Sequence, residues 1–168
     1  FSKLVPTVSV VTNIDREHLD YHGSFENLEM AFQSFVSSIP FYGFNVLCID
    51  HPSVQKLLPL NKDRRLLTYG RSANADVRAT SISYIKSFSV FDLILSDKVY
   101  SGGQAWEKVK LPMIGNHNIL NGSASILASI FAGVKIKSIK KSLENYNGVK
   151  RRFTLIGEKK NYKVYDDY

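Results

Sequence analysis

Four side chains that could bind a divalent cation follow the first apolar run of the chain. They are Asp15, Glu17, His18 and Asp20, and carboxylate oxygens and imidazole nitrogens are common ligands of such ions. The run before them, VSVV at residues 8–11, is typical of a strand buried on both faces of a parallel sheet. Open α/β sheets bind their ligands at the carboxyl ends of such strands. An exposed polar loop with a helix N-cap and one solvated histidine has the same composition, so the motif alone leaves both interpretations open.

A second polar group opens an apolar helix that we predict to run to about Ala132. Asn118 and Asn121 stand three residues apart, which places both side chains on one face of its first turns. Each amide offers a donor and an acceptor, so the pair could bind the edge of a planar heterocycle. Both residues could instead cap the start of the helix, which is the commoner use of asparagine there.

The elements that must position both groups follow a strand–helix–strand order. Apolar runs at residues 8–14, 44–50 and 66–69 predict three strands, which we expect to lie side by side and parallel in one sheet. Residues 24–38 predict an amphipathic helix with Ser24 as its N-cap. Its apolar stripe consists of Leu28, Phe32, Phe35, Val36 and Ile39. In such a βαβ arrangement, His18 and Asn118 should lie on the same edge of the sheet.

The second half of the chain has a different strand pattern. Residues 76–111 alternate apolar and polar positions, which predicts a small antiparallel accessory sheet. A short helix is expected at 52–58 and another helix at 138–145, followed by two strands around a turn at 159–161. The predicted fold class is therefore α/β, with a mostly parallel sheet, flanking helices and the accessory sheet. The turn-forming pair Asn147-Gly148 predicts a domain boundary, with one domain at 1–148 and another at 149–168.

Composition excludes some classes of protein. The chain has 168 residues and a net charge of +7, but its basic residues are dispersed and no arginine-rich tract or aromatic stacking motif accompanies them. A nucleic-acid partner is therefore not the first expectation. No apolar stretch has membrane-spanning length and no signal peptide opens the chain, so we expect no membrane insertion. The single cysteine, Cys48, lies in an apolar run, which predicts a buried, inert thiol in a reducing compartment.

Several catalytic motifs are absent from the sequence. It contains no G-x-x-x-x-G-K-[ST] loop, no G-x-G-x-x-G loop, no zinc-type cluster of Cys or His and no G-x-S-x-G elbow. A nucleotide enzyme needs a phosphate cradle. We therefore expect the isolated chain not to turn over ATP. The first residue is Phe1 rather than Met, which favours a processed form or a fragment.

Five short motifs, taken together and in order, resemble the Mur ligases, the ATP-dependent enzymes that add amino acids to the peptidoglycan precursor. The motifs are T-N-I-x-x-E-H-L-D-Y from Thr12, P-F-Y-G from Pro40, G-x-H-N-x-x-N from Gly115, R-R-F from Arg151 and V-Y-D-D-Y from Val164. Each motif is weak alone, but the ordered set spans nearly the whole chain. The stretch 39–43 and the ending 166–168 favour the member of the family that joins L-alanine to UDP-N-acetylmuramate.

The resemblance implies a role for individual residues. His18 matches a histidine that ligates a catalytic magnesium ion. Asn118 and Asn121 match asparagines that contact the adenine of ATP, with His117 beside them. Arg152 matches an arginine near the nucleotide phosphates. Two further matches concern the end of the chain: Asp167 corresponds to the acid on the ribose hydroxyls, and Tyr168 would lie near the incoming amino acid.

The resemblance also explains the missing phosphate cradle. In this family the phosphate-binding loop and an acidic metal ligand lie just upstream of the position of Phe1, and most of the C-terminal domain lies downstream of Tyr168. It therefore implies that the chain is a fragment: the central ATP-binding domain without its phosphate loop, and the first strands of the C-terminal ligase domain.

The implied reaction forms an amide. The γ-phosphoryl group of ATP passes to the muramoyl carboxylate, the amine of L-alanine attacks the acyl phosphate, and phosphate leaves. Magnesium would offset the charge of the phosphoryl group. The implied setting is cytoplasmic peptidoglycan synthesis, and thus cell-wall biogenesis, cell shape and cell division. Two alternatives stay open: a sister ligase that adds a peptide to the same sugar nucleotide, and a non-catalytic, basic α/β module that binds polyanions.

Overall fold

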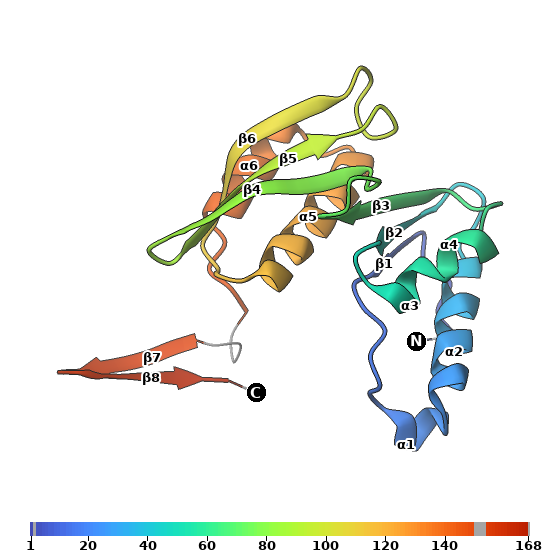
Figure 1. Ribbon diagram of the computed structural model, residues 1–168, viewed down its shortest axis with the longest axis horizontal. Helices are drawn as coiled ribbons and strands as arrows, with labels where there is room; N and C mark the ends of the chain where they lie inside the picture. The colour runs from blue at the N-terminus through green and yellow to red at the C-terminus, as the bar shows by residue number, and fades with distance from the viewer. Residues whose placement is uncertain (2, 150–153, 168) are drawn as a thin grey trace.

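The computed structural model describes residues 1, 3–149 and 154–167 (Figure 1). Its strands form one six-stranded sheet, in the order β1-β2-β3-β4-β5-β6, and a separate two-stranded sheet, β7-β8. The prediction of an α/β fold with a mostly parallel sheet and flanking helices is confirmed, and the small antiparallel sheet that accompanies it is β7-β8. Within the part of the chain that is described, no helix is both long and apolar enough to cross a membrane.

The first three strands are parallel neighbours, as predicted. They are β1 (Val8–Val11), β2 (Phe44–Cys48) and β3 (Leu66–Gly70), and Val11 of β1 pairs with Leu47 of β2. All five residues of β2 are buried, because helices cover both faces of this half of the sheet. Gly43 permits the chain to enter β2 beside β1: a Cβ on Gly43 would lie 2.3 Å from the carbonyl oxygen of Thr7.

Three helices cover one face of these parallel strands, and a fourth, the first in the chain, packs on the second helix. They are α1 (Leu19–His22), α2 (Phe25–Ser37), α3 (Pro52–Gln55) and α4 (Leu57–Leu60). Ser24 caps α2, as predicted, since its hydroxyl accepts from the backbone N–H of Asn27 at 3.2 Å. The core beneath these helices consists of Val11, Ile14, Leu28, Val36, Leu47, Val54 and Leu57.

The remaining strands extend the same sheet. They are β4 (Val77–Ile85), β5 (Phe88–Leu95) and β6 (Gln104–Leu111), and they pair in the predicted antiparallel manner. However, β4 is also bonded to β3, in parallel, through Tyr69–Val77 and Gly70–Arg78. Residues 76–111 are therefore the antiparallel half of the large sheet rather than a sheet of their own. Alternation in the sequence predicts strand type, but it contains no information on this two-residue junction.

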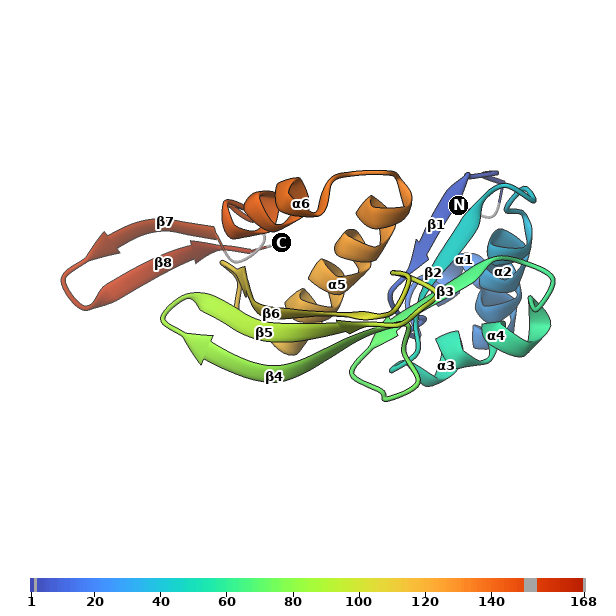
Figure 2. The same ribbon diagram turned by 90° about the horizontal axis from the view of Figure 1, so that it is seen from above.

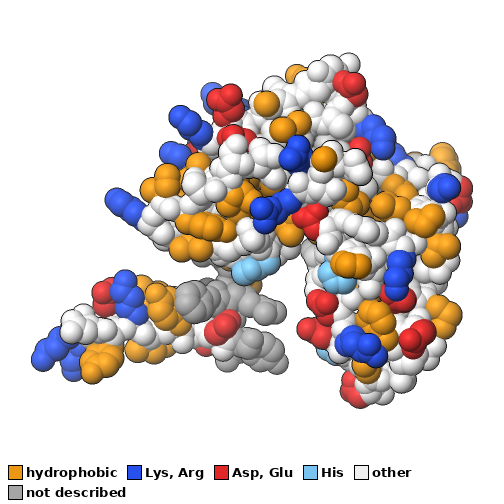
Figure 3. Space-filling view, in the orientation of Figure 1, with side chains coloured by type: hydrophobic (Ala, Val, Ile, Leu, Met, Phe, Trp, Pro, Cys, Tyr) orange, Lys and Arg blue, Asp and Glu red, His pale blue; other side chains and the backbone are white. Residues whose placement is uncertain are grey.

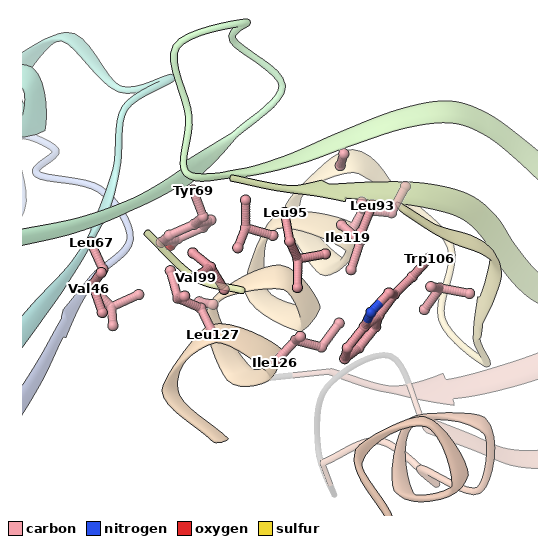
Figure 4. Close-up of a cluster of buried hydrophobic side chains, with 14 of the residues drawn as sticks. Val46, Leu67, Tyr69, Leu93, Leu95, Val99, Trp106, Ile119, Ile126 and Leu127 are labelled. Carbon is pink, nitrogen blue, oxygen red and sulfur yellow. The ribbon is translucent and has the colours of Figure 1, made fainter. Parts of the chain in front are cut away.

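Two helices cover the opposite face, and Figure 2 shows both of them beside β4–β6. The longer helix, α5 (Asn116–Phe131), contacts every strand from β1 to β5, and α6 (Ile136–Glu144) packs on β6. Their contact with the sheet forms the larger core, in which Tyr69, Leu93, Trp106, Ile119 and Leu127 are almost fully buried (Figure 4). This packing fixes the direction of α5 and so the place of its first turn.

The last two strands, β7 (Thr154–Lys159) and β8 (Tyr162–Asp166), form the predicted hairpin. They pair with each other and with no strand of the six-stranded sheet. The division into domains at residue 148 stays a prediction.

Candidate functional site

The loop after β1 brings the predicted cation ligands to one hollow. A hollow of ≈ 460 Å³ is lined by, among others, Asn13, Asp15, Glu17, His18 and Asp20. His18 is exposed and begins α1 in the left-handed conformation, with φ 55° and ψ 31°. That conformation is uncommon for a residue with a side chain, and surrounding structure must hold it. Within residues 1, 3–149 and 154–167, however, no three His, Cys, Asp or Glu side chains converge to hold a metal ion.

Asp15 is held on both sides of its carboxylate. Its Oδ1 lies 3.2 Å from Nε2 of His51, and its Oδ2 accepts a hydrogen bond from the Asn13 side chain. The hydrogen bond from Asn13, followed by that from His51, lowers the pKa of Asp15 below its usual value. The carboxylate is therefore ionised at neutral pH, and it ties the loop after β1 to the loop after β2.

Asp50 makes the next link along the same edge. Its carboxylate accepts from the backbone N–H groups of Arg71 at 2.7 Å and Ser72 at 3.0 Å. Gly70 allows this approach, because a Cβ there would lie 2.4 Å from Asp50 Oδ1. The loops after β1, β2 and β3 are thus joined by two acidic residues, which makes this edge of the sheet a connected structure.

The first turn of α5 holds the predicted adenine-binding residues. Gly115 precedes the helix with φ 112°, and the ring of His117 lies beside it, since a Cβ on Gly115 would be 3.0 Å from His117 Cε1. Asn118 donates from Nδ2 to the carbonyl oxygen of Ile114 at 2.8 Å. Its amide nitrogen is thus used locally, but it does not cap the helix, because a cap accepts from a backbone N–H and Gly115 at the N-cap has no side chain to do so. Asn121 is exposed on the same face.

This turn lies on the carboxyl-end side of the parallel strands. The hydroxyl of Tyr84 donates to Asn116 Oδ1 at 3.1 Å. Arg78 of β4 is level with Gly70, the last residue of β3, and the six residue-to-residue steps from Arg78 to Tyr84 span on the order of 20 Å. The start of α5 therefore lies beyond the carboxyl ends of the parallel strands, on the side where His18 follows β1. Figure 3 shows a gap on this face of the molecule, with histidine side chains on both of its sides. This gap is not the hollow at His18, which no residue of α5 lines.

The other predicted site residues lie at the end of the chain. Asp167 is exposed and directly follows β8 in the separate hairpin. Arg152 and Tyr168 lie outside the described residues. The structure therefore brings the His18 loop and the asparagine pair to the edge of the sheet at the carboxyl ends of the parallel strands. The functional roles of these residues, like those of Asp167, Arg152 and Tyr168, stay predictions.

Sequence reasoning missed three residues that organise this side: His51, Asp50 and Tyr84. The first two follow the buried β2 directly, which is the same signal that pointed to the loop after β1. Tyr84 gave no signal, because its partner Asn116 is brought near it only by the packing of α5 on the sheet.

Comparison with known proteins finds relatives of the chain. The profile of the Mur ligase middle domain matches residues 1–129. UDP-N-acetylmuramate–L-alanine ligases of Parvibaculum lavamentivorans and Methylocella silvestris are 45% and 46% identical to the chain over all 168 residues, which are 34% and 36% of those proteins. The chain thus spans about a third of the length of the curated relatives it matches.

Solved structures share the fold. MurF from Acinetobacter baumannii matches 97% of this chain and 34% of its own, with a TM-score of 0.79 and 24% identity. The UDP-N-acetylmuramate–alanine ligase of Thermotoga maritima matches 99% of this chain and 36% of its own, with a TM-score of 0.78 and 22% identity. A MurF ligase of the same organism, in complex with ADP, matches 96% of this chain and 35% of its own, with a TM-score of 0.73 and 21% identity.

Proposed function

Because the chain belongs to the Mur ligase family through its middle domain, we propose that it forms most of the ATP-binding domain of a ligase that joins L-alanine to UDP-N-acetylmuramate. One observation carries the proposal. The match to ligases named for this reaction covers all 168 residues at 45% and 46% identity, and thus includes residues 130–168, beyond the family profile.

The asparagine pair is proposed to bind adenine. Asn118 uses its amide nitrogen on Ile114, which leaves its carbonyl oxygen to accept from an amino group, while the exposed Asn121 offers both donor and acceptor. The structurally similar Thermotoga maritima MurF is in complex with ADP, which supports a nucleotide on this fold. His117, beside Gly115, would border the same pocket.

His18 is proposed to supply one ligand to a magnesium ion, whose chemistry in phosphoryl transfer is to neutralise phosphate charge. Imidazole is an unusual ligand for so hard a cation, and the described residues form no complete set of ligands. The described residues therefore supply one ligand of the ion, and groups outside them would supply the others. Three carboxylates, those of Asp15, Glu17 and Asp20, border the same hollow, next to the apolar side chains of Ile14, Leu28 and Phe32.

The remaining roles rest on the family match alone. Arg152 would stabilise the nucleotide phosphates, Asp167 would bind the ribose hydroxyls, and Tyr168 would lie near the amino acid. Residues 1–148 would form the middle domain, and residues 149–168 would begin a C-terminal domain. The setting would be cytoplasmic, where ATP and the sugar nucleotide are available.

In the proposed reaction, an oxygen of the muramoyl carboxylate attacks the γ-phosphorus of ATP, and ADP leaves. The amine of L-alanine then attacks the carbonyl carbon of the acyl phosphate. The tetrahedral intermediate collapses with loss of inorganic phosphate, and an amide remains. The part of this chain is to hold adenine at α5 and to present His18 at the phosphate end, on the same side of the sheet.

The test is phosphate release by the protein made from the complete reading frame that encodes this chain. We expect release that requires ATP, UDP-N-acetylmuramate and L-alanine together. Release with an alanyl-glutamyl-diaminopimelyl peptide in place of L-alanine would identify a sister ligase instead. No release with either, together with a salt-dependent shift on a nucleic-acid gel, would favour the polyanion-binding module.

A further inference from the structure

The loop that carries His18 has few anchors. Its residues 15–18 are all exposed, and only Ile14 is buried, at 2% exposure. His18 itself adopts a left-handed backbone conformation with no side-chain cap, which is strained for a residue with a side chain and needs support from its neighbours. A contact outside the loop must therefore hold the loop in place.

The contact that meets this need is the one between Asp15 and His51. Asp15 lies four residues beyond Val11, His51 lies four residues beyond Leu47, and Val11 and Leu47 are paired in the sheet. The two side chains therefore meet across adjacent strand ends, with 3.2 Å between Asp15 Oδ1 and His51 Nε2. The other oxygen of Asp15 accepts from Asn13, so the carboxylate cannot turn away without losing a hydrogen bond.

The chemistry of this contact fixes the tautomer of His51. An ionised carboxylate only accepts hydrogen bonds, so Nε2 of His51 must carry the proton. The other ring nitrogen, Nδ1, is buried and has no hydrogen-bond partner within the described part of the chain. A proton there would leave a buried donor unsatisfied, which costs more than an unsatisfied lone pair. His51 is itself held at the N-cap of α3, where Pro52 begins the helix.

We propose that His51 is a positioning residue, which acts through Asp15 to hold the loop that presents His18 to the metal. This inference rests on the metal role of His18 in the proposed function. It assigns to His51 no contact with substrate or ion. Partners of this kind are worth about 10–100-fold in metal affinity or activity in metalloenzymes.

Two substitutions of His51 separate positioning from simple packing. Gln places an amide N–H close to the position of Nε2, whereas Asn places it close to that of Nδ1. In the protein from the complete reading frame, His51→Asn should raise the magnesium concentration for half-maximal phosphate release about tenfold. His51→Gln should bring that magnesium concentration most of the way back to the value of the unsubstituted protein. The KM for L-alanine should not change in either variant.

A second measurement does not depend on catalysis. Asp15 is 55% exposed in its side chain, so Asp15→Ala removes the same contact with little effect on packing. Hydrogen exchange of the backbone amides of residues 16–19 should become faster in both Asp15→Ala and His51→Asn, and exchange in β2 should not change. If the exchange of the loop is the same as in the unsubstituted protein, the proposal is wrong.

Failure of the proposed function has a different signature. If His18→Ala leaves the magnesium requirement unchanged, the metal role of His18 is wrong, and the exchange rates alone decide whether His51 holds the loop. A third outcome is that His18→Ala raises the magnesium requirement, whereas His51→Asn speeds exchange and leaves the requirement unchanged. His51 then holds the loop but does not position His18 for the metal, and the proposal is overturned.

Discussion

Tyr84 donates a hydrogen bond across 3.1 Å to Asn116, and so joins the far end of β4 to the first turn of α5. The antiparallel half belongs to the same sheet as the parallel half because β4 pairs with β3. Strand β4 extends the sheet past the carboxyl ends of the parallel strands, and its Tyr84 supports the start of α5 there. The asparagine pair is in this way placed on the side of the sheet where the loop after β1 presents His18.

Asn121→Ala should chiefly raise the KM for ATP in the complete protein. An adenine contact is made equally in the ground and transition states, so its loss weakens binding and leaves kcat unchanged. A lost neutral hydrogen bond costs about 0.5–1.5 kcal/mol, which is roughly a threefold to tenfold rise. Asn145→Ala, at the end of α6, is the matched control and should leave KM unchanged. A lowered melting temperature with normal kinetics would identify Asn121 as a structural residue only.

His18→Ala should chiefly lower kcat, because a metal ligand acts on charge that develops in the transition state. We expect a loss of about tenfold or more, since even outer-shell partners of metal ligands are worth about 10–100-fold. His22→Ala is the control, because it removes a second imidazole from the same hollow, one whose ring packs edge-on against Tyr21. Steady-state kinetics in which the two variants behave alike would remove His18 from the metal site.

Gly70→Ala should destabilise the isolated chain. The new methyl group would meet Asp50 Oδ1 at 2.4 Å and force the carboxylate off the two backbone N–H groups that it accepts from. Hydrogen bonds to a charged group are worth about 1.5–3 kcal/mol, so urea unfolding should show a loss of that order. Gly157→Ala has open space around its Cβ and should change stability little. Equal midpoints for both variants would show that Asp50 can move without cost.

Cys48 should be unreactive in the folded chain. Burial raises the pKa of its thiol above the usual value, and the side chain is 3% exposed. Since the thiolate is the nucleophile, a disulfide reagent at pH 8 should modify Cys48 slowly in buffer and rapidly in denaturant. Modification at the same rate in both conditions would show that β2 opens readily or that the thiol is accessible.

Sequence patterns predicted most of the elements, since periodicity reports burial directly. The apolar run at β2 and the capping serine of α2 are local signals, and both were confirmed. The junction of β3 and β4 was not predicted, because it depends on two residue pairs. For the same reason the links Asp15–His51 and Tyr84–Asn116, which join residues far apart in the chain, were invisible until the strands and α5 were placed. The asparagine pair was identified by spacing, but spacing gave no sign that Asn118 donates to Ile114.

The most direct test of the account uses UDP-N-acetylmuramate labelled with ¹⁸O in its muramoyl carboxylate, together with ATP, L-alanine and the protein from the complete reading frame. An acyl phosphate transfers one carboxylate oxygen to phosphate when the amine displaces it. We predict by mass spectrometry a sugar nucleotide that has gained one alanyl residue and kept one of its two ¹⁸O atoms, and inorganic phosphate that contains the other. Unlabelled phosphate, or no alanyl product under conditions in which a known ligase of this family forms it, would contradict the account.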